Sequence, residues 1–170
     1  LAIGFDGSIA KSSEVDLAGA GAIFDISAAD TAQTIRNLAG VAGTTVALGG
    51  KTLMFGTADS TDFAGSVSGF GQFIKQGSGT LTLSGDSSGF AGTTLVNGGI
   101  VDLGPPSAPN ARLGGDVTLQ NGAILVGYGT IGGSLNNANG LVVPFTAAGK
   151  TLTVGSYPQG GAGTLGIAIT

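Results

Sequence analysis

The sequence predicts an all-β solenoid, in which short strands wind into stacked coils. Glycine makes up 34 of the 170 residues and divides the chain into runs that are long enough for strands and too short for helices. Apolar and polar residues alternate within these runs, as they do in strands with one buried face. Short motifs also recur, for example Phe-Ala-Gly at residues 63–65 and 90–92. With about 20 to 28 residues per coil, the chain would form about six to eight coils.

The clearest alternation surrounds Leu81 and Leu83, in the segment Thr-Leu-Thr-Leu-Ser. Because successive side chains of a strand point to opposite faces, the two leucines share one face and the hydroxyl residues share the other. We expect the leucine face to line the inside of the solenoid, together with Val96, Val101 and Leu103. Each buried aliphatic side chain contributes about 1.5 to 3 kcal/mol, and only stacked coils can bury it.

The N-terminal third of the chain is predicted to consist of short strands. Weak strand patterns cover residues 1–5, 15–17 and 23–26, and clearer patterns cover residues 44–48 and 51–55. These patterns predict that the solenoid begins well before the leucine-rich strands.

Residues 30–38 have the only composition that is compatible with a helix. Asp30 is a suitable capping residue, and Ala32, Ile35 and Leu38 lie near helical spacing. We predict a strand here, because a single short helix would interrupt the stack of coils.

The two Phe-Ala-Gly motifs predict an aromatic contact. If the motifs occupy equivalent corners of adjacent coils, Phe63 and Phe90 stack on one another. Such a ring pair is worth about 0.5 to 1.5 kcal/mol beyond the area that it buries.

Residues 104–110 contain three of the five prolines, at positions 105, 106 and 109. Proline donates no hydrogen bond to a strand ladder, so this segment cannot be a central strand and is expected to leave the rod as a loop. A passive insertion at a corner is the favoured interpretation, and a binding loop is the alternative.

Two adjoining segments carry a family pattern. Residues 75–85 are Lys-Gln-Gly-Ser-Gly-Thr-Leu-Thr-Leu-Ser-Gly, and residues 92–104 are Gly-Thr-Thr-Leu-Val-Asn-Gly-Gly-Ile-Val-Asp-Leu-Gly. This pattern resembles the autotransporter-associated β-strand repeat of secreted passenger domains in Gram-negative bacteria. The resemblance implies a single-stranded, right-handed parallel β-helix that is extracellular, either anchored at the outer membrane or released.

A second resemblance begins near residue 116. Residues 122–133 are Gly-Ala-Ile-Leu-Val-Gly-Tyr-Gly-Thr-Ile-Gly-Gly, and residues 163–165 are Gly-Thr-Leu. Both segments resemble the pertactin-like C-terminal region of passengers, from which the sequence departs at residues 143–145 and at Pro158. The resemblance implies that residues 1–115 form coils of the passenger rod. It also implies that residues 116–170 form a C-terminal β-helix segment that promotes passenger folding during export.

The composition argues against several classes of function. Only 9% of the residues are charged, the net charge is -4, and the six basic residues are scattered singly, so we expect no nucleic-acid partner. The chain has no histidine, which is the usual general base and the commonest metal ligand. We therefore expect no catalytic residue, no cofactor or metal site and no small-molecule substrate.

One pair of acids keeps an enzymatic alternative open. Glu14 and Asp16 are two residues apart and would share a strand face, as the acids of a polysaccharide lyase or hydrolase built on a β-helix would. No aromatic platform, histidine or arginine accompanies the pair, so a solvated outer face is the favoured interpretation.

Leu95 and Ile100 point outward if Val96 and Val101 point inward. Single exposed aliphatic side chains are common on protein surfaces. If these two lie together, they mark a possible lateral contact.

The function that we expect is non-catalytic. The resemblance implies a surface rod that acts in adhesion to host surfaces or in association between copies. The chain begins at Leu1 and ends at Thr170 without an obvious cap, so we expect a fragment. In this family a C-terminal outer-membrane β-barrel would lie outside it.

Overall fold

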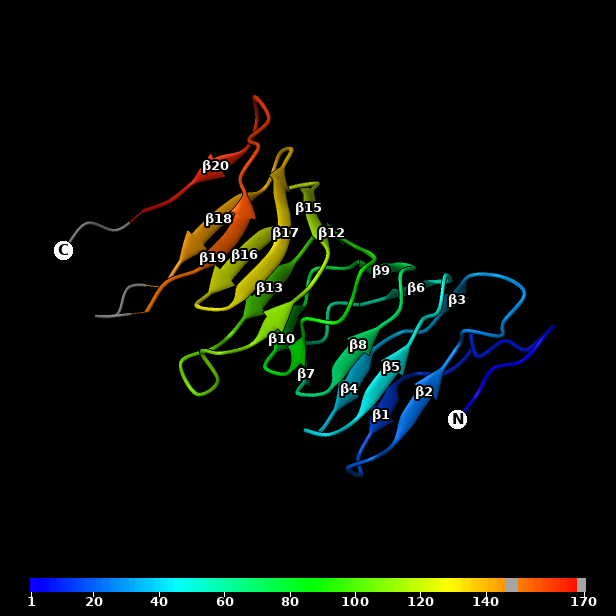
Figure 1. Ribbon diagram of the computed structural model, residues 1–170. Helices are drawn as coiled ribbons and strands as arrows, with labels where there is room; N and C mark the ends of the chain where they lie inside the picture. The colour runs from blue at the N-terminus through cyan, green and yellow to red at the C-terminus, as the bar shows by residue number, and fades with distance from the viewer. Residues whose placement is uncertain (146–149, 168–170) are drawn as a thin grey trace.

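The chain folds into a solenoid with three faces, each built from strands of successive coils (Figure 1). The computed structural model describes residues 1–145 and 150–167, which contain twenty strands and no helix. All strand pairings among them are parallel. The predicted all-β, parallel solenoid is therefore confirmed. Two parts of the predicted C-terminal segment, 146–149 and 168–170, lie outside the described residues.

The first face is an eight-stranded sheet. Its strands, in order along the solenoid, are β1 (Val15–Leu17), β4 (Leu38–Gly40), β7 (Thr61–Phe63), β10 (Thr80–Leu83), β13 (Ile100–Leu103), β16 (Ile124–Gly127), β18 (Leu141–Pro144) and β20 (Thr164–Leu165). Because neighbouring strands of this sheet are one coil apart, the eight strands define about seven coils, within the predicted range of six to eight.

The other two faces merge towards the C-terminal end. The second face contains β3 (Gln33–Thr34), β6 (Thr52–Phe55), β9 (Gln72–Lys75), β12 (Thr93–Asn97), β15 (Asp116–Gln120) and the end of β17 (Thr130–Asn137). The third face begins with β2 (Ile23–Asp25), β5 (Thr45–Ala47) and β8 (Ser66–Ser68). It continues with β11 (Asp86–Ser87), β14 (Arg112–Leu113), the start of β17, and β19 (Thr153–Ser156). The link from β8 to β11 includes a hydrogen bond from Val67 N to Ser87 Oγ of 2.9 Å.

β17 is long because it runs around a corner of the solenoid. It pairs with β14 at its start and with β15 at its end, and its register with β19 shifts between Ile131 and Ser134. Residues 132 and 133 at this shift are both glycine. A bulge with glycine bends a strand sharply, so two faces share one strand here.

Coils differ in length although their strands stay in register. Phe63 pairs with Leu83 and Leu83 pairs with Leu103, so these two coils are equally long. Leu103 pairs with Gly127, which makes the next coil longer, and Gly127 pairs with Pro144, which makes the following coil shorter than any of these. The differences are therefore absorbed in the turns at the corners.

The core fills the inside of the solenoid, as the alternation predicted. Leu81, Leu83, Val96, Val101 and Leu103 are all buried, and none is more than 6% exposed. One continuous cluster of buried apolar side chains extends along the stack. Burial in the described coils thus comes from neighbours above and below, because each coil covers the next.

A column of glycines lets one corner of successive coils stack closely. Gly71, Gly92, Gly115, Gly133 and Gly155 follow one another along the solenoid at this corner. A Cβ at Gly92 would lie against the carbonyl oxygen of Gly71, and a Cβ at Gly115 would lie against that of Gly92. Only glycine permits this backbone contact without a shift of the coils.

The predicted N-terminal strands are found with small differences. β1 covers the predicted residues 15–17, β2 covers most of 23–26, and residues 30–38 contribute to β3 and β4 with no helix. Residues 1–5 form only an isolated bridge, from Ala2 to Asp25. The first coil has no neighbour on one side among the described residues, which explains why pairing is weakest there.

The strand register does not place Phe63 and Phe90 at equivalent positions. Phe63 ends β7 on the first face and pairs with Leu83 of the next coil. Phe90 lies before β12, and Ala91 beside it donates a hydrogen bond of 2.9 Å to Gly69 O. The two Phe-Ala-Gly motifs therefore lie at different corners of the solenoid. The alignment of repeats from which the ring contact was predicted does not match the strand register.

Two other aromatic pairs form among the described residues. Phe55 and Phe73 lie on adjacent strands of the second face, with ring centroids 4.6 Å apart. Tyr128 and Phe145 make an edge contact at 5.4 Å. Phe63 and Phe90 are each fully buried in the hydrophobic core cluster.

Candidate functional site

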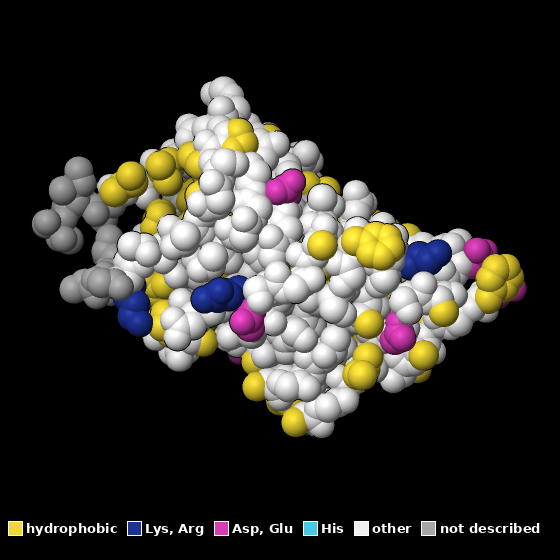
Figure 2. All heavy atoms as spheres, viewed as in Figure 1, with side chains coloured by type: hydrophobic (Ala, Val, Ile, Leu, Met, Phe, Trp, Pro, Cys, Tyr) yellow, Lys and Arg dark blue, Asp and Glu magenta, His cyan; other side chains and the backbone are white. Residues whose placement is uncertain are grey.

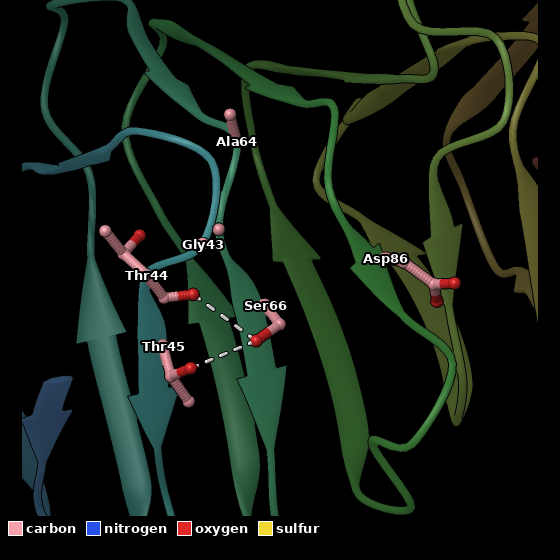
Figure 3. Close-up of a pocket in the computed structure, with 7 residues that line it drawn as sticks. Gly43, Thr44, Thr45, Ala64, Ser66 and Asp86 are labelled. Atoms are coloured by element: carbon pink, nitrogen blue, oxygen red, sulfur yellow. Dashed lines mark hydrogen bonds between the residues drawn. The ribbon is translucent and has the colours of Figure 1, made fainter. Parts of the chain in front are cut away.

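Three hollows adjoin one another along one side of the rod, and we call them together the polar groove. The first hollow has a volume of about 330 Å³ and lies between β5, β8 and β11 (Figure 3). Its lining is Gly43, Thr44, Thr45, Ala64, Gly65, Ser66 and Asp86. Asp86 also lines the second hollow, and Pro109 and Asn110 line both the second and the third. Neighbouring hollows therefore share lining residues along this side of the rod, from β5 to β19.

Hydroxyl groups of adjacent coils are linked in the first hollow. Thr45 Oγ1 and Ser66 Oγ are 3.2 Å apart, and Ser66 Oγ also donates to Thr44 O at 3.3 Å (Figure 3). Strands β5 and β8 hold these side chains in register, with Thr45 opposite Ser66. The result is a rigid polar surface that can both donate and accept hydrogen bonds.

The loop at residues 104–110 lines both the second and the third hollow. As predicted, the loop projects from the rod, and it lies between β13 and β14 (Figure 1). Ala108 N donates to Pro105 O at 2.8 Å, and Ala111 N donates to Ala108 O at 3.3 Å, so the loop consists of hydrogen-bonded turns. The second hollow, of about 330 Å³, lies between this loop and Asp86, and both contribute to its lining.

The third hollow, of about 210 Å³, brings together residues that are far apart in the sequence. Its lining is Pro109, Asn110, Arg112, Tyr128, Thr130, Lys150, Thr151 and Thr153. Two of these side chains are basic, and most of the others carry hydroxyl or amide groups. The hollow is therefore polar and positively charged.

Parallel pairing sets a column of side chains along the floor of the groove. Asp86 pairs with Arg112, Arg112 pairs with Thr130, and Thr130 pairs with Thr153. Neighbouring strands are about 4.8 Å apart, so the column presents one polar side chain per coil at that spacing.

The Asp86 carboxylate is held ionised by its own turn. Hydrogen bonds from the side chain and backbone of Ser88 lower the pKa of Asp86, and the charge of Arg112 lowers it further. The bond from Ser88 N to Asp86 Oδ1 is 2.8 Å. The groove thus carries a negative charge at its centre and two positive charges at one end.

Figure 2 shows the character of the visible surface. Most of it is white, which marks backbone and uncharged polar side chains, with scattered hydrophobic side chains and a few basic and acidic groups. A surface of this kind makes contact through many individually weak hydrogen bonds.

Lys75, the first residue of the repeat pattern, faces the inside of the solenoid. It is 3% exposed, and its Nζ donates to the carbonyl oxygens of Gln76, Gly77 and Gly98 at 3.2 to 3.3 Å. Burial lowers the pKa of Lys75. This lysine joins the corners of two coils and does not reach the outer surface.

Leu95 and Ile100 lie on different faces of the solenoid. Leu95 is in β12 on the second face, where it pairs with Ile74, and Ile100 is in β13 on the first face, where it pairs with Ile124. Both are half-buried. They do not form one shared patch, and a lateral contact at either position stays a prediction.

The acids considered for an enzyme lie away from the groove. Glu14 and Asp16 are exposed at β1, as the solvated-face interpretation expects, and neither lines any of the three hollows. No three potential metal-ligating side chains gather anywhere in residues 1–145 and 150–167. In the same part of the chain there is no helix long and apolar enough to cross a membrane.

Sequence reasoning did not identify the groove. Arg112 and Lys150 are far apart in the sequence, and each is an isolated basic residue there. The three prolines of residues 104–110 were the available signal, because they predicted a loop projecting beside the strands that carry the site.

Comparisons with known proteins agree with the family pattern. Residues 73–103 match the family described as the passenger-associated-transport-repeat. The chain is 33% identical over 136 residues to the adhesin BmaC autotransporter of Brucella suis biovar 1 (strain 1330), which covers 78% of this chain and 4% of that protein.

Two further relatives come from Escherichia coli (strain K12). The uncharacterized protein YuaQ is 32% identical over 100 residues, which cover 59% of this chain and 7% of YuaQ. The uncharacterized lipoprotein YdeK is 34% identical over 84 residues, which cover 49% of this chain and 6% of YdeK. No solved structure gives a significant match.

The matched repeat starts at Phe73 in β9 and ends at Leu103 in β13, so it covers more than one coil of the solenoid. The chain spans less than a tenth of the length of each of these three relatives. It therefore carries an autotransporter passenger-associated repeat and is homologous to part of an autotransporter adhesin.

Proposed function

We propose that this chain is a non-catalytic segment of a secreted autotransporter passenger that acts in adhesion at the surface of a Gram-negative bacterium. The observation that carries the proposal is the polar groove, which runs along a solenoid homologous to part of an adhesin. Rigid, hydrogen-bonding surfaces of this kind bind weakly at each point and gain strength when many copies act together. The partners are host surfaces or other copies of the same passenger.

Adhesion is tested with beads that carry many copies of the chain. We expect coated beads to bind host epithelial cells above the level of albumin-coated beads, and soluble chain in excess to compete. Sedimentation velocity over a range of concentrations measures association between copies in the same preparation. Binding no greater than that of albumin beads, together with a chain that stays monomeric at every concentration, would contradict the proposed function.

We also propose that residues 116–170 promote folding of the passenger, as distinct from the rod coils of residues 1–115. Strand length supports this role: β17 has eight residues, whereas no described strand of the rod coils has more than five. Longer ladders place more hydrogen bonds in each pairing and so favour a nucleus in this part of the chain.

Pulsed hydrogen exchange during refolding of the whole chain tests this order. We expect amides in β15 to β17 to become protected before amides in β1 to β5, because a solenoid folds outward from its most stable coils. Mass spectrometry of peptides from quenched samples measures both regions together. Earlier protection of the N-terminal strands is the outcome that excludes a C-terminal nucleus.

A further inference from the structure

The third hollow concentrates positive charge in an acidic chain. The whole chain has six basic residues and a net charge of -4, and two of the six, Arg112 and Lys150, line this one hollow of about 210 Å³. Its described lining includes no acidic side chain. Asp86 on the neighbouring strand offsets part of the Arg112 charge, and an anion bound in the hollow would also meet the Lys150 ammonium group.

The frame of the hollow is rigid where the arginine is attached. Arg112 begins β14, which pairs with β11 on one side and with β17 on the other. Its backbone N donates to Gly85 O at 3.1 Å. Tyr128 beside it is 8% exposed and packs against Phe145. Binding groups carried on paired strands are held more precisely than groups on loops.

The chemistry of the lining selects the kind of ligand. A guanidinium group holds a carboxylate or sulfate through two parallel hydrogen bonds, and an ammonium group adds a second positive charge. Thr130, Thr151 and Thr153 supply hydroxyl groups, which both donate to and accept from the hydroxyls of a sugar. A peptide ligand would need apolar pockets for its side chains, and this lining offers few apolar groups.

The groove beyond the hollow fits a polymer. Pro109 and Asn110 connect the third hollow to the second, and Asp86 connects the second to the first. We infer that the third hollow binds the anionic group of an acidic polysaccharide, with Arg112 and Lys150 holding the carboxylate or sulfate and with Asn110 and the lining threonines contacting the neighbouring sugars. This inference rests on the proposed adhesive function and names its ligand class.

Titration calorimetry of the whole 170-residue chain tests the ligand class. The probes are polygalacturonate for carboxylates, dextran sulfate for sulfates, neutral dextran, and polyglutamate as an anionic peptide. We expect at least one acidic polysaccharide to bind, more weakly at higher salt because charge is screened, and dextran not to bind. Absence of binding by both acidic polysaccharides overturns the inference, as does polyglutamate binding equally well.

A double variant with a charge-matched control tests the site. Arg112→Gln with Lys150→Gln should weaken polysaccharide binding about tenfold or more, because it removes both charged hydrogen-bond donors that hold the anionic group. Arg36→Gln with Lys11→Gln makes the same change in net charge at exposed residues outside the groove. We expect less than about a twofold effect there. Equal losses of polysaccharide binding in both double variants would show that the overall charge of the chain attracts the polymer, and would overturn the proposed site.

Two controls separate a local effect from other causes. Circular dichroism and thermal unfolding should be unchanged in both double variants, because all four substituted side chains are exposed. Arg112→Lys keeps the charge and loses the paired hydrogen bonds, so it should bind between wild type and Arg112→Gln. Full binding by Arg112→Gln alone would overturn the role of the arginine.

The bead assay distinguishes this inference from the proposed function. If wild-type beads adhere and beads with Arg112→Gln and Lys150→Gln adhere equally well, the anion site is overturned and adhesion stands. If the chain binds an acidic polysaccharide through these residues but wild-type beads do not adhere, the site stands and the adhesive function fails.

Discussion

Replacing Gly92 with alanine should lower the free energy of unfolding by about 3 kcal/mol or more, because overpacking costs this much when only backbone can move away. The added Cβ would lie against the carbonyl oxygen of Gly71 in the coil below and against the ring of Phe90. Relief of the contact requires two coils to separate at this corner, which also weakens the strand pairing beside it.

Gly89→Ala is the matched control for this prediction. A Cβ at Gly89 meets no atom within 4 Å, and its φ angle does not lie in the left-handed region. Urea unfolding followed by circular dichroism should therefore give a much lower midpoint for Gly92→Ala and an unchanged midpoint for Gly89→Ala. Similar midpoints for the two variants would mean that the corner is not closely stacked.

Replacing Phe73 with alanine should cost about 3 to 5 kcal/mol of folding free energy, the usual range for a fully buried aromatic side chain. Phe73 is 0% exposed, and its ring lies 4.6 Å from that of Phe55. Its removal leaves a cavity inside the solenoid that the flanking strands, held in register on both sides, cannot close.

Phe70→Ala serves as the control, since Phe70 is 74% exposed and lies close to Phe73 in the sequence. We expect its effect on the urea midpoint to be small, within about 0.5 kcal/mol for a surface substitution. A large loss of stability in Phe70→Ala, or a small one in Phe73→Ala, would show that the inward and outward faces of this coil have been assigned in reverse.

The inside of the solenoid was predictable because it depends on local periodicity alone. Leu81 and Leu83 face inward whatever the neighbouring coil is, since strand side chains alternate. The loop at residues 104–110 was predictable for a similar reason, because proline cannot donate to a ladder. Neither inference depends on the length of a coil.

The contacts between coils were not predictable in the same way. The coil from Leu103 to Gly127 is longer than the coil from Leu83 to Leu103, so a repeated motif does not fix which residues are stacked. The expected stacking of Phe63 on Phe90 followed from taking the repeated Phe-Ala-Gly motif as the mark of one corner, whereas the register puts the two motifs at different corners. The convergence of Arg112 and Lys150 was missed because it also depends on the register.

The corner turns have a practical consequence for engineering. Because the long coil that ends at Gly127 and the short coil that ends at Pro144 keep the same parallel pairing, added length is confined to the turn where it is inserted. The turn between β13 and β14 already carries such an insertion, so a foreign epitope grafted there would be displayed without changing the pitch of the rod. The solenoid can therefore serve as a scaffold that presents exchangeable peptides at a constant spacing.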